Sequence, residues 1–256
     1  MPLSQPTTGL LLVGHGTRDP RGQAEFLTLA ERVGAALAPQ PVEAGYIELS
    51  EPTIGDAFRR LVDQGVGQVR VVPLLLFAAG HAKSDVPEAI HQAAALHSHI
   101  KVDVTPPFGL DEHLLSLSER RYREAIAGRS AIEGLETYWL LVGRGSSDPT
   151  TTEDLARFGA ERARRSSLTR FGHCFVAAAR PTLADGLSAA ASSEAKRIVV
   201  QPHLLFRGAV LDEVAAAVNR WGPRRPDIDW VMTAHLGPEQ ELVEAVIERA
   251  LLEFKL

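Results

Sequence analysis

Cysteine is almost absent from this chain of 256 residues, since Cys174 is the only one. A single thiol cannot form an internal disulfide or supply the thiolates of a structural zinc site, and it fits a reducing compartment. Residues 1–9 lack the charged start and apolar core of a signal peptide. The longest apolar runs are the length of a strand, too short to span a bilayer. We therefore expect a cytoplasmic protein with no membrane partner.

An excess of positive charge is also missing. The net charge is -5 and the isoelectric point is near 6.0, so we expect no nucleic-acid partner. The chain has no Gly-x-Gly-x-x-Gly fingerprint and no Gly-Lys-Ser/Thr phosphate loop, which disfavours a nucleotide-binding module and the use of ATP. It also lacks the Gly-x-Ser-x-Gly elbow of serine hydrolases. The apolar and charged contents, 45% and 23%, are those of an ordinary globular protein.

What the chain does contain is an internal repeat. Residues 14–20 (GHGTRDP) return as residues 143–149 (GRGSSDP), residues 46–48 return as 175–177, and residues 72–77 return as 201–206. Each match is displaced by the same 129 residues. A fixed displacement of this kind indicates a duplicated structural unit. We therefore predict two domains, residues 1–127 and 138–256, joined by a short linker.

Each half alternates apolar runs with amphipathic stretches. The predicted strands lie near residues 10–14, 42–49, 68–77 and 100–105, and again near 138–143, 173–178, 197–203 and 228–233. The predicted helices lie near residues 20–37, 52–62, 85–96 and 112–126, and again near 149–165, 181–192, 210–221 and 238–254. Alternation of this kind predicts an α/β fold with parallel sheets and right-handed crossovers. The expected architecture is two similar doubly wound domains that face each other.

Three polar residues lie at or just past the ends of three predicted strands in the first half: His15, Glu48 and His81. The carboxyl ends of parallel strands meet at one edge of the sheet, where such folds bind ligands. Taken alone, a histidine after a glycine turn is more often a cap or a phosphate contact, and a glutamate at a strand end is usually solvated. Their joint placement favours a single site for metal binding or proton transfer.

The second half has lost all three candidates while its frame survives. Arg144 stands at the position of His15, Ala177 at that of Glu48 and, after a one-residue gap, Ala209 at that of His81. Joint loss suggests that the three served one site in the first half. The second half is then expected to close a cleft over that site, because pockets favour domain interfaces.

The predicted ligand set suits a first-row divalent metal such as Co, Fe, Ni or Zn. Three protein ligands leave coordination positions open for a substrate, unlike a closed structural site. Other histidines carry weaker signals. His91, His97 and His99 straddle a helix end and are expected on a solvated surface, whereas His203 lies in an apolar strand and is expected in the core or the cleft.

The first half closely resembles the sirohydrochlorin chelatases, the class II cobaltochelatases and siroheme ferrochelatases. The resemblance rests on residues 14–19, 47–52 and 72–76, with His81 and Asp85 following in order. It covers roughly residues 9–126, and the second half matches in frame only, as in the long two-repeat members. The resemblance implies that His15 and His81 bind the metal and act on the tetrapyrrole, and that Glu48 completes the site.

The resemblance also implies a reaction: insertion of Fe(II) or Co(II), with Ni(II) as a further candidate substrate, into sirohydrochlorin without ATP. Siroheme and cobalamin synthesis both use such an enzyme, and the sequence leaves the two open. A non-catalytic metal or tetrapyrrole carrier is the alternative. The fused halves predict a monomer that is an internal pseudo-dimer. Cations beside the motifs are expected to bind the carboxylates of sirohydrochlorin: Arg18, Lys83, Arg144 and Arg207.

Overall fold

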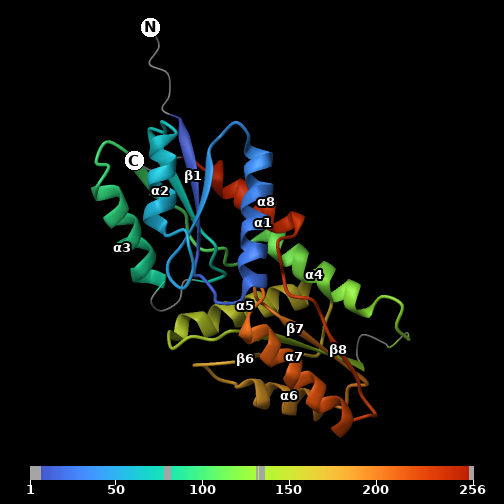
Figure 1. Cartoon of the computed structure of the whole chain (residues 1–256). Helices are drawn as coiled ribbons and strands as arrows, with labels where there is room; N and C mark the ends of the chain where they lie inside the picture. Colours follow the sequence, from blue (N-terminus) through green and yellow to red (C-terminus); the bar gives the residue numbers. More distant parts are fainter. Residues whose placement is uncertain (1–6, 78–81, 131, 133–135, 254–256) are drawn as a thin grey trace. The chain divides into compact units, whose positions relative to one another are not determined.

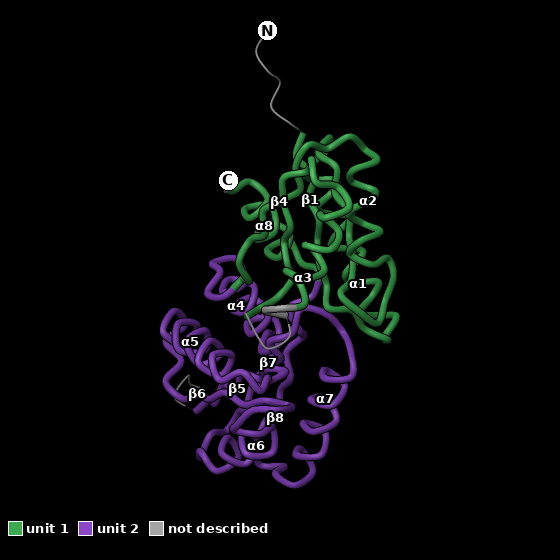
Figure 2. Tube along the Cα trace, turned by 90° about the vertical axis from the view of Figure 1, so that its left-hand side faces the viewer, with its two compact units in different colours: residues 1–108, 238–256 green, residues 109–237 purple. Residues whose placement is uncertain are grey.

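The computed structural model describes residues 7–77, 82–130, 132 and 136–253 (Figure 1). Contacts within the chain divide it into two compact units (Figure 2). Unit 1 comprises Met1–Phe108 and Pro238–Leu256, and unit 2 comprises Gly109–Gly237. No helix in the described part of the chain is long and apolar enough to cross a membrane.

Unit 1 is built on a parallel sheet of four strands in the order β2-β1-β3-β4. The strands are β1 (Thr8–Gly14), β2 (Val42–Tyr46), β3 (Gln68–Pro73) and β4 (Lys101–Val104). The helices are α1 (Pro20–Leu37), α2 (Ile54–Asp63), α3 (Ala82–Ala95) and α8 (Gln240–Ala250). Helices α2 and α3 cover one face, and α1 and α8 the other (Figure 1). Both faces of β1 are therefore buried, which explains its continuous apolar run.

Unit 2 repeats this plan with the strand order β6-β5-β7-β8. Its strands are β5 (Thr137–Gly143), β6 (Phe171–Phe175), β7 (Arg197–Pro202) and β8 (Asp229–Met232). Its helices are α4 (Glu112–Ile126), α5 (Pro149–Arg165), α6 (Leu183–Ala191) and α7 (Ala209–Trp221), followed by a short 3-10 turn, Gly222–Arg224. All pairings in both sheets are parallel. The predicted fold of two similar doubly wound parallel sheets is confirmed.

The same capping residues begin corresponding helices in the two units. Asp19 caps α1 and Asp148 caps α5, and in each case a proline follows at the first helical position. Thr53 forms a capping box with Asp56 at the start of α2, and Thr182 with Asp185 does so at α6. These side chains accept from backbone N–H groups that the first helical turn leaves without partners.

Two predicted strands of the first half end three or four residues earlier in the structure. The second ends at Tyr46 rather than at residue 49, and the third at Pro73 rather than at residue 77. Beyond Tyr46 the chain turns back, since the Tyr46 N–H donates to the Pro52 carbonyl at 2.9 Å. Beyond Pro73, the Leu74 N–H still donates to the Val13 carbonyl at 2.8 Å. Ile47 and Leu74, just beyond the two strands, still pair with the end of β1, since their N–H groups donate to the carbonyls of Gly14 and Val13.

The closing helices of the two repeats are exchanged between the compact units. Helix α4 ends the first repeat in sequence but belongs to unit 2, and α8 ends the second repeat but belongs to unit 1. The predicted domains, residues 1–127 and 138–256, follow the two sequence repeats and stay a prediction. The compact units differ from these repeats in the placement of α4 and α8. An amphipathic helix encodes an apolar face, but not which sheet that face covers.

One arginine on each exchanged helix holds it to the unit that it joins. In unit 2, the guanidinium of Arg121 donates to the carbonyls of His235 and Leu236, both at 2.9 Å. In unit 1, the guanidinium of Arg249 donates to the Phe108 carbonyl at 3.1 Å and lies over the Phe108 ring, 4.4 Å from its centroid. Helix α4 is therefore hydrogen-bonded to residues 235–236, just before the chain leaves unit 2, and α8 to residue 108, just before the chain leaves unit 1.

Matching strand positions beneath the exchanged helices differ in polarity between the two units. In unit 2, the indole N–H of Trp139 donates to the Gln201 amide oxygen at 2.8 Å, and the Gln201 amide nitrogen donates to the carbonyl and hydroxyl of Ser118 on α4. The corresponding strand positions in unit 1 hold Leu10 and Val72, both fully buried. Buried polar groups need specific hydrogen-bond partners, and Ser118 on α4 supplies them to Gln201. The polar network in unit 2 therefore favours packing of α4 against this sheet.

Arg162 on α5 extends this difference, since its side chain is completely buried. Its guanidinium lies between the rings of Tyr122 and Trp139, 5.7 and 5.5 Å from their centroids, and donates to the Ser166 hydroxyl. Burial lowers its pKa to about 10, so it is still charged at neutral pH. The corresponding residue of unit 1 is Val33, which is also fully buried.

We expect Gln201→Val, which installs the residue that unit 1 uses, to lower the free energy of unfolding of unit 2 by about 1–3 kcal/mol. The substitution leaves the buried Trp139 indole N–H without an acceptor, and an unsatisfied buried donor has a cost of this size. Urea unfolding followed by tryptophan fluorescence measures it, because all three tryptophans lie in unit 2. The exposed Gln92→Ala serves as control, and equal stability of the two variants would contradict the expectation.

Candidate metal centre

Two of the predicted ligands meet at the carboxyl edge of the first sheet. His15 follows the last residue of β1, and Glu48 lies two residues beyond the end of β2. The Nε2 atom of His15 lies 3.2 Å from Oε1 of Glu48. The two side chains are 39% and 54% exposed, so a ligand can reach both. Imidazole nitrogen and carboxylate oxygen are both ligands for first-row divalent metals, and this pair can therefore begin such a site.

The backbone brings these side chains together because β1 and β2 remain paired beyond the sheet. The Ile47 N–H donates to the Gly14 carbonyl at 2.9 Å, and the Glu48 N–H donates to the His15 carbonyl at 3.1 Å. The turn that carries His15 and the turn that carries Glu48 thus run side by side. Main-chain hydrogen bonds consequently fix the backbone positions from which the two side chains extend.

This close approach requires glycine at position 16. Gly16 has a φ of 100°, and a Cβ atom placed on it would lie 1.8 Å from the Glu48 carbonyl oxygen. The second unit keeps the same constraint, since Gly145 has a φ of 92° and a Cβ there would lie 1.8 Å from the Ala177 carbonyl oxygen. The backbone of the turn is therefore duplicated, whereas the side chains that could bind a metal occur in unit 1.

A hydrogen-bond network supports the His15 turn in unit 1. The Ser50 hydroxyl donates to the Thr17 carbonyl at 2.8 Å and accepts from the Thr17 N–H at 3.2 Å. The Gln23 side-chain amide donates to the Thr17 carbonyl at 2.7 Å and to the Ser50 hydroxyl at 3.2 Å. Sequence analysis missed Ser50 and Gln23 as supporting residues. Their signal was in the repeat, where alanine and threonine stand at the corresponding positions 179 and 152.

The remaining predicted site residues are placed less completely. His81 lies outside the described residues, and Lys83 lies in α3 with an undescribed side chain. Arg18 is exposed in unit 1, one turn beyond His15. Arg144 and Arg207 are exposed in unit 2, after β5 and β7 respectively. Among the described residues, no group of three or more His, Cys, Asp or Glu side chains could hold a metal ion.

His203 is a buried residue at the end of β7. Its N–H donates to the Val142 carbonyl at 2.8 Å, as that of Leu74 does to Val13 in unit 1. The imidazole packs on the ring of Phe158, with centroids 4.2 Å apart, and is only 2% exposed. Burial lowers the pKa of His203 to about 3, which keeps the ring neutral at physiological pH. These properties fit a packed core residue.

His91 on α3, and His97 and His99 just beyond it, are not part of any group of potential metal ligands among the described residues. The ring of His97 stacks against Phe58 at a centroid distance of 5.9 Å, and its centroid is 6.5 Å from that of His99. His91 and His99 are exposed. This agrees with a largely solvated surface on which His97 covers part of the core.

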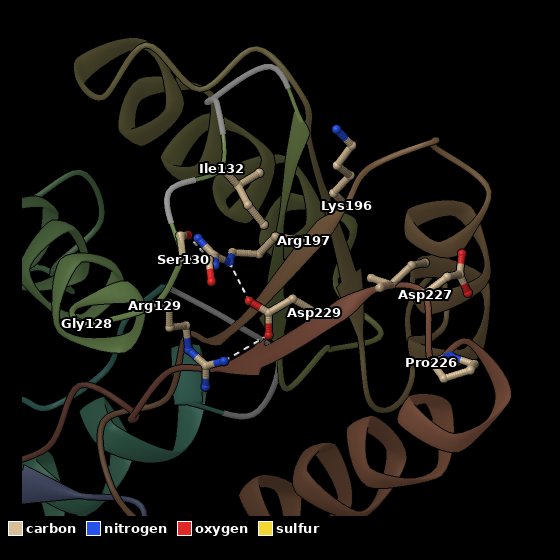
Figure 3. Close-up of a pocket in the computed structure, with 10 residues that line it drawn as sticks. Gly128, Arg129, Ser130, Ile132, Lys196, Arg197, Pro226, Asp227 and Asp229 are labelled. Carbon is tan, nitrogen blue, oxygen red and sulfur yellow. Dashed lines mark hydrogen bonds and ion pairs between the residues drawn. The ribbon is translucent and has the colours of Figure 1, made fainter.

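A cavity of about 590 Å³ lies in unit 2, at the amino-terminal ends of β7 and β8. Figure 3 shows Arg129 and Arg197 reaching Asp229 from two sides, at 2.8 and 2.7 Å. Arg197 also donates to the Ser130 carbonyl at 3.0 Å. Arg129, Arg197 and Asp229 are thus engaged with one another, whereas Lys196 and Asp227 pair with Glu136 and Arg225, which do not line the cavity. The cavity is at the opposite edge of the sheet from the strand ends that carry the predicted motifs.

The chain is similar in sequence and in structure to sirohydrochlorin chelatases. The CbiX family model matches residues 9–125 and again residues 139–251. A sirohydrochlorin ferrochelatase of Priestia megaterium is 33% identical over 205 residues, which cover 80% of this chain and 76% of the relative. A sirohydrochlorin cobaltochelatase of the same organism is 26% identical over 243 residues, covering 94% and 78%. The structure of SirB from Bacillus subtilis with Fe3+ superposes with a TM-score of 0.85 at 27% identity, covering 95% and 94%.

We expect Gly16→Ala to weaken metal binding by about 10–100-fold, because the new Cβ forces apart the turns that carry His15 and Glu48. Gly145→Ala is the matched control, since it introduces the same backbone clash in unit 2, in a turn that carries neither residue of this pair. Both variants should unfold at lower temperature than the wild type. Anaerobic calorimetric titration with Co(II) separates the two effects. Equal losses of affinity in both variants, or none in Gly16→Ala, would contradict this account of the turn.

Proposed function

The chain belongs to the CbiX family, and we propose that it inserts a divalent metal, Fe(II) or Co(II), into sirohydrochlorin through a site formed by His15, Glu48 and His81. The observation that carries the proposal is the His15–Glu48 pair, 3.2 Å apart at the edge of the first sheet, within a chain that the family model matches twice. Relatives named as sirohydrochlorin chelatases align over most of this chain, which supports the reaction.

The reaction exchanges the ligands of the metal and the protons of the macrocycle. The incoming M(II) ion gives up water and gains pyrrole nitrogens, while two pyrrole N–H groups each release a proton. Near neutral pH an imidazole can either bind a metal or accept a proton. The partly exposed ring of His15 is available for both tasks. The Glu48 carboxylate offsets the positive charge of the metal and can accept a proton as the metal leaves.

Holding the metal in a fixed position accounts for much of the expected rate enhancement. The main-chain bonds between the two turns position His15 and Glu48 before any ligand binds. A metal held there meets the macrocycle as part of one complex, which removes the entropic cost of a separate encounter. Three protein ligands would leave coordination positions open to the pyrrole nitrogens. His81 is proposed as the third ligand on the resemblance of residues 72–81 alone.

Four cations are proposed to bind the carboxylates at the rim of sirohydrochlorin. Arg18 and Lys83 belong to the first half, and Arg144 and Arg207 to the second. Arg144 is the most informative, because it occupies the position of His15 and exchanges a metal ligand for a residue suited to carboxylates. Its side chain is exposed at the end of β5, where a ligand can reach it.

The range of substrates and the assembly are further parts of the proposal. Fe(II) and Co(II) are supported by relatives named for iron and for cobalt. Ni(II) is proposed as an additional substrate because the same ligand set accepts it. Independence from ATP is proposed from a sequence without a phosphate loop. Two homologous units in one chain support a monomer that needs no second copy.

An anaerobic absorbance assay tests the reaction, with sirohydrochlorin and Fe(II), Co(II) or Ni(II) supplied without ATP. We expect the wild type to accelerate metallation, His15→Ala to fall to near the uncatalysed rate, and Glu48→Gln to lose about 10²–10³-fold. Losses of this size follow from the removal of a ligand that also transfers protons. Relative rates rank the three metals.

The controls separate the site from general effects of substitution. His99→Ala removes an exposed histidine elsewhere in unit 1 and should retain the wild-type rate. Arg144→Ala should raise KM by about tenfold, which corresponds to the loss of one charge-assisted hydrogen bond. If the wild type is no faster than the uncatalysed reaction with every metal yet still binds metal or sirohydrochlorin, the chelatase proposal fails in favour of a carrier.

A further inference from the structure

We propose that Leu49 is a positioning residue for the macrocycle, and that its side chain packs against the apolar face of the ring beside His15 and Glu48. The inference deepens the proposed function and rests on it. The metal chemistry does not require a leucine at this position, because an aliphatic side chain cannot bind a metal or transfer a proton.

Leu49 lies directly beside the paired turns. It follows Glu48 in the chain, and its Cβ atom lies 3.6 Å from the point that a Cβ on Gly16 would occupy. The leucine side chain therefore starts next to the glycine that follows His15. A side chain that begins here is close enough to contact a flat ligand whose centre approaches the His15–Glu48 pair.

The conformation of Leu49 is unfavourable for a leucine. Its φ is 63°, in the left-handed region that glycine adopts freely and branched side chains rarely adopt. The side chain gains little from the fold in return, because 49% of the residue is exposed. A large apolar side chain held exposed on a strained backbone is more readily explained by contact with a ligand than by stability of the unit.

The second repeat provides an internal comparison. Ala178 occupies the corresponding position with a φ of 54°, and the preceding Ala177 N–H donates to the Arg144 carbonyl at 2.9 Å as Glu48 does to His15. The same backbone turn thus forms without any side chain beyond Cβ. The leucine side chain occurs in the repeat that also carries the histidine and the glutamate, which associates it with their ligand.

The chemistry of the ligand fits this placement. A tetrapyrrole presents an extended apolar face around its nitrogens and carboxylates at its rim. Cations at the strand ends can bind the rim, but they do not fix the height or tilt of the ring above the metal. An apolar contact beside the ligand pair gains free energy from the water that it displaces, and it holds the ring face toward the metal.

Three variants of Leu49 test the inference: Leu49→Ala, Leu49→Gly and Leu49→Met. The dissociation constant of metal-free sirohydrochlorin is measured by quenching of its fluorescence, and KM, kcat and Tm are measured alongside. We expect the alanine and glycine variants to raise Kd and KM by about tenfold, equivalent to about 1.4 kcal/mol, with a much smaller change in kcat. Leu49→Met retains an apolar side chain of similar size and should stay within threefold of the wild type.

Thermal unfolding distinguishes a positioning role from a structural one. Glycine tolerates a positive φ, so Leu49→Gly should keep or raise Tm while it weakens binding. Leu96→Ala, which trims an exposed leucine elsewhere in unit 1, should leave Kd within twofold. Unchanged sirohydrochlorin binding in Leu49→Ala, or a Tm that falls together with binding, would overturn the inference while the wild type remains an active chelatase. Failure of the wild type to bind or metallate sirohydrochlorin would instead refute the proposed function and this inference with it.

Discussion

The candidate site depends on the close approach of two main-chain turns at the ends of β1 and β2. The Glu48 N–H donates to the His15 carbonyl, and the space between the turns admits no side chain at residue 16. Once glycine satisfies that constraint, the imidazole and the carboxylate are brought within 3.2 Å of each other. Ser50 and Gln23 then secure the first turn through the Thr17 carbonyl. Parallel strand pairing therefore positions the chemistry.

The two repeats distinguish residues that the backbone turn requires from residues that the proposed chemistry requires. Both units retain the glycine with positive φ, the left-handed residue after the second turn, and the helix caps. The second unit replaces the histidine with Arg144 and the glutamate with Ala177. Residues that occur in both copies thus serve the fold, whereas those confined to the first are candidates for function. This comparison within one chain identifies Leu49, Ser50 and Gln23 as well as the predicted ligands.

The two units also differ beneath the helices that they exchange. At the positions that correspond to Trp139, Gln201 and Arg162, unit 1 has Leu10, Val72 and Val33, whereas unit 2 packs α4 over the bonded set of Trp139, Gln201 and Ser118. Ser118, near the centre of α4, accepts hydrogen bonds from the Gln201 amide. An apolar sheet surface could not donate these hydrogen bonds. The unlike cores therefore favour the observed assignment of each closing helix to its sheet.

The sequence alone determined the parallel α/β architecture, because apolar runs that alternate with amphipathic stretches are local signals. It also predicted which strand ends carry His15 and Glu48, since the carboxyl ends of parallel strands share one edge. Only the tertiary structure decided that β2 ends at Tyr46, that Ser50 and Gln23 hold the His15 turn, and that α4 and α8 exchange units. These features depend on contacts between residues far apart in the chain, and an amphipathic pattern specifies that a face is buried without specifying its partner.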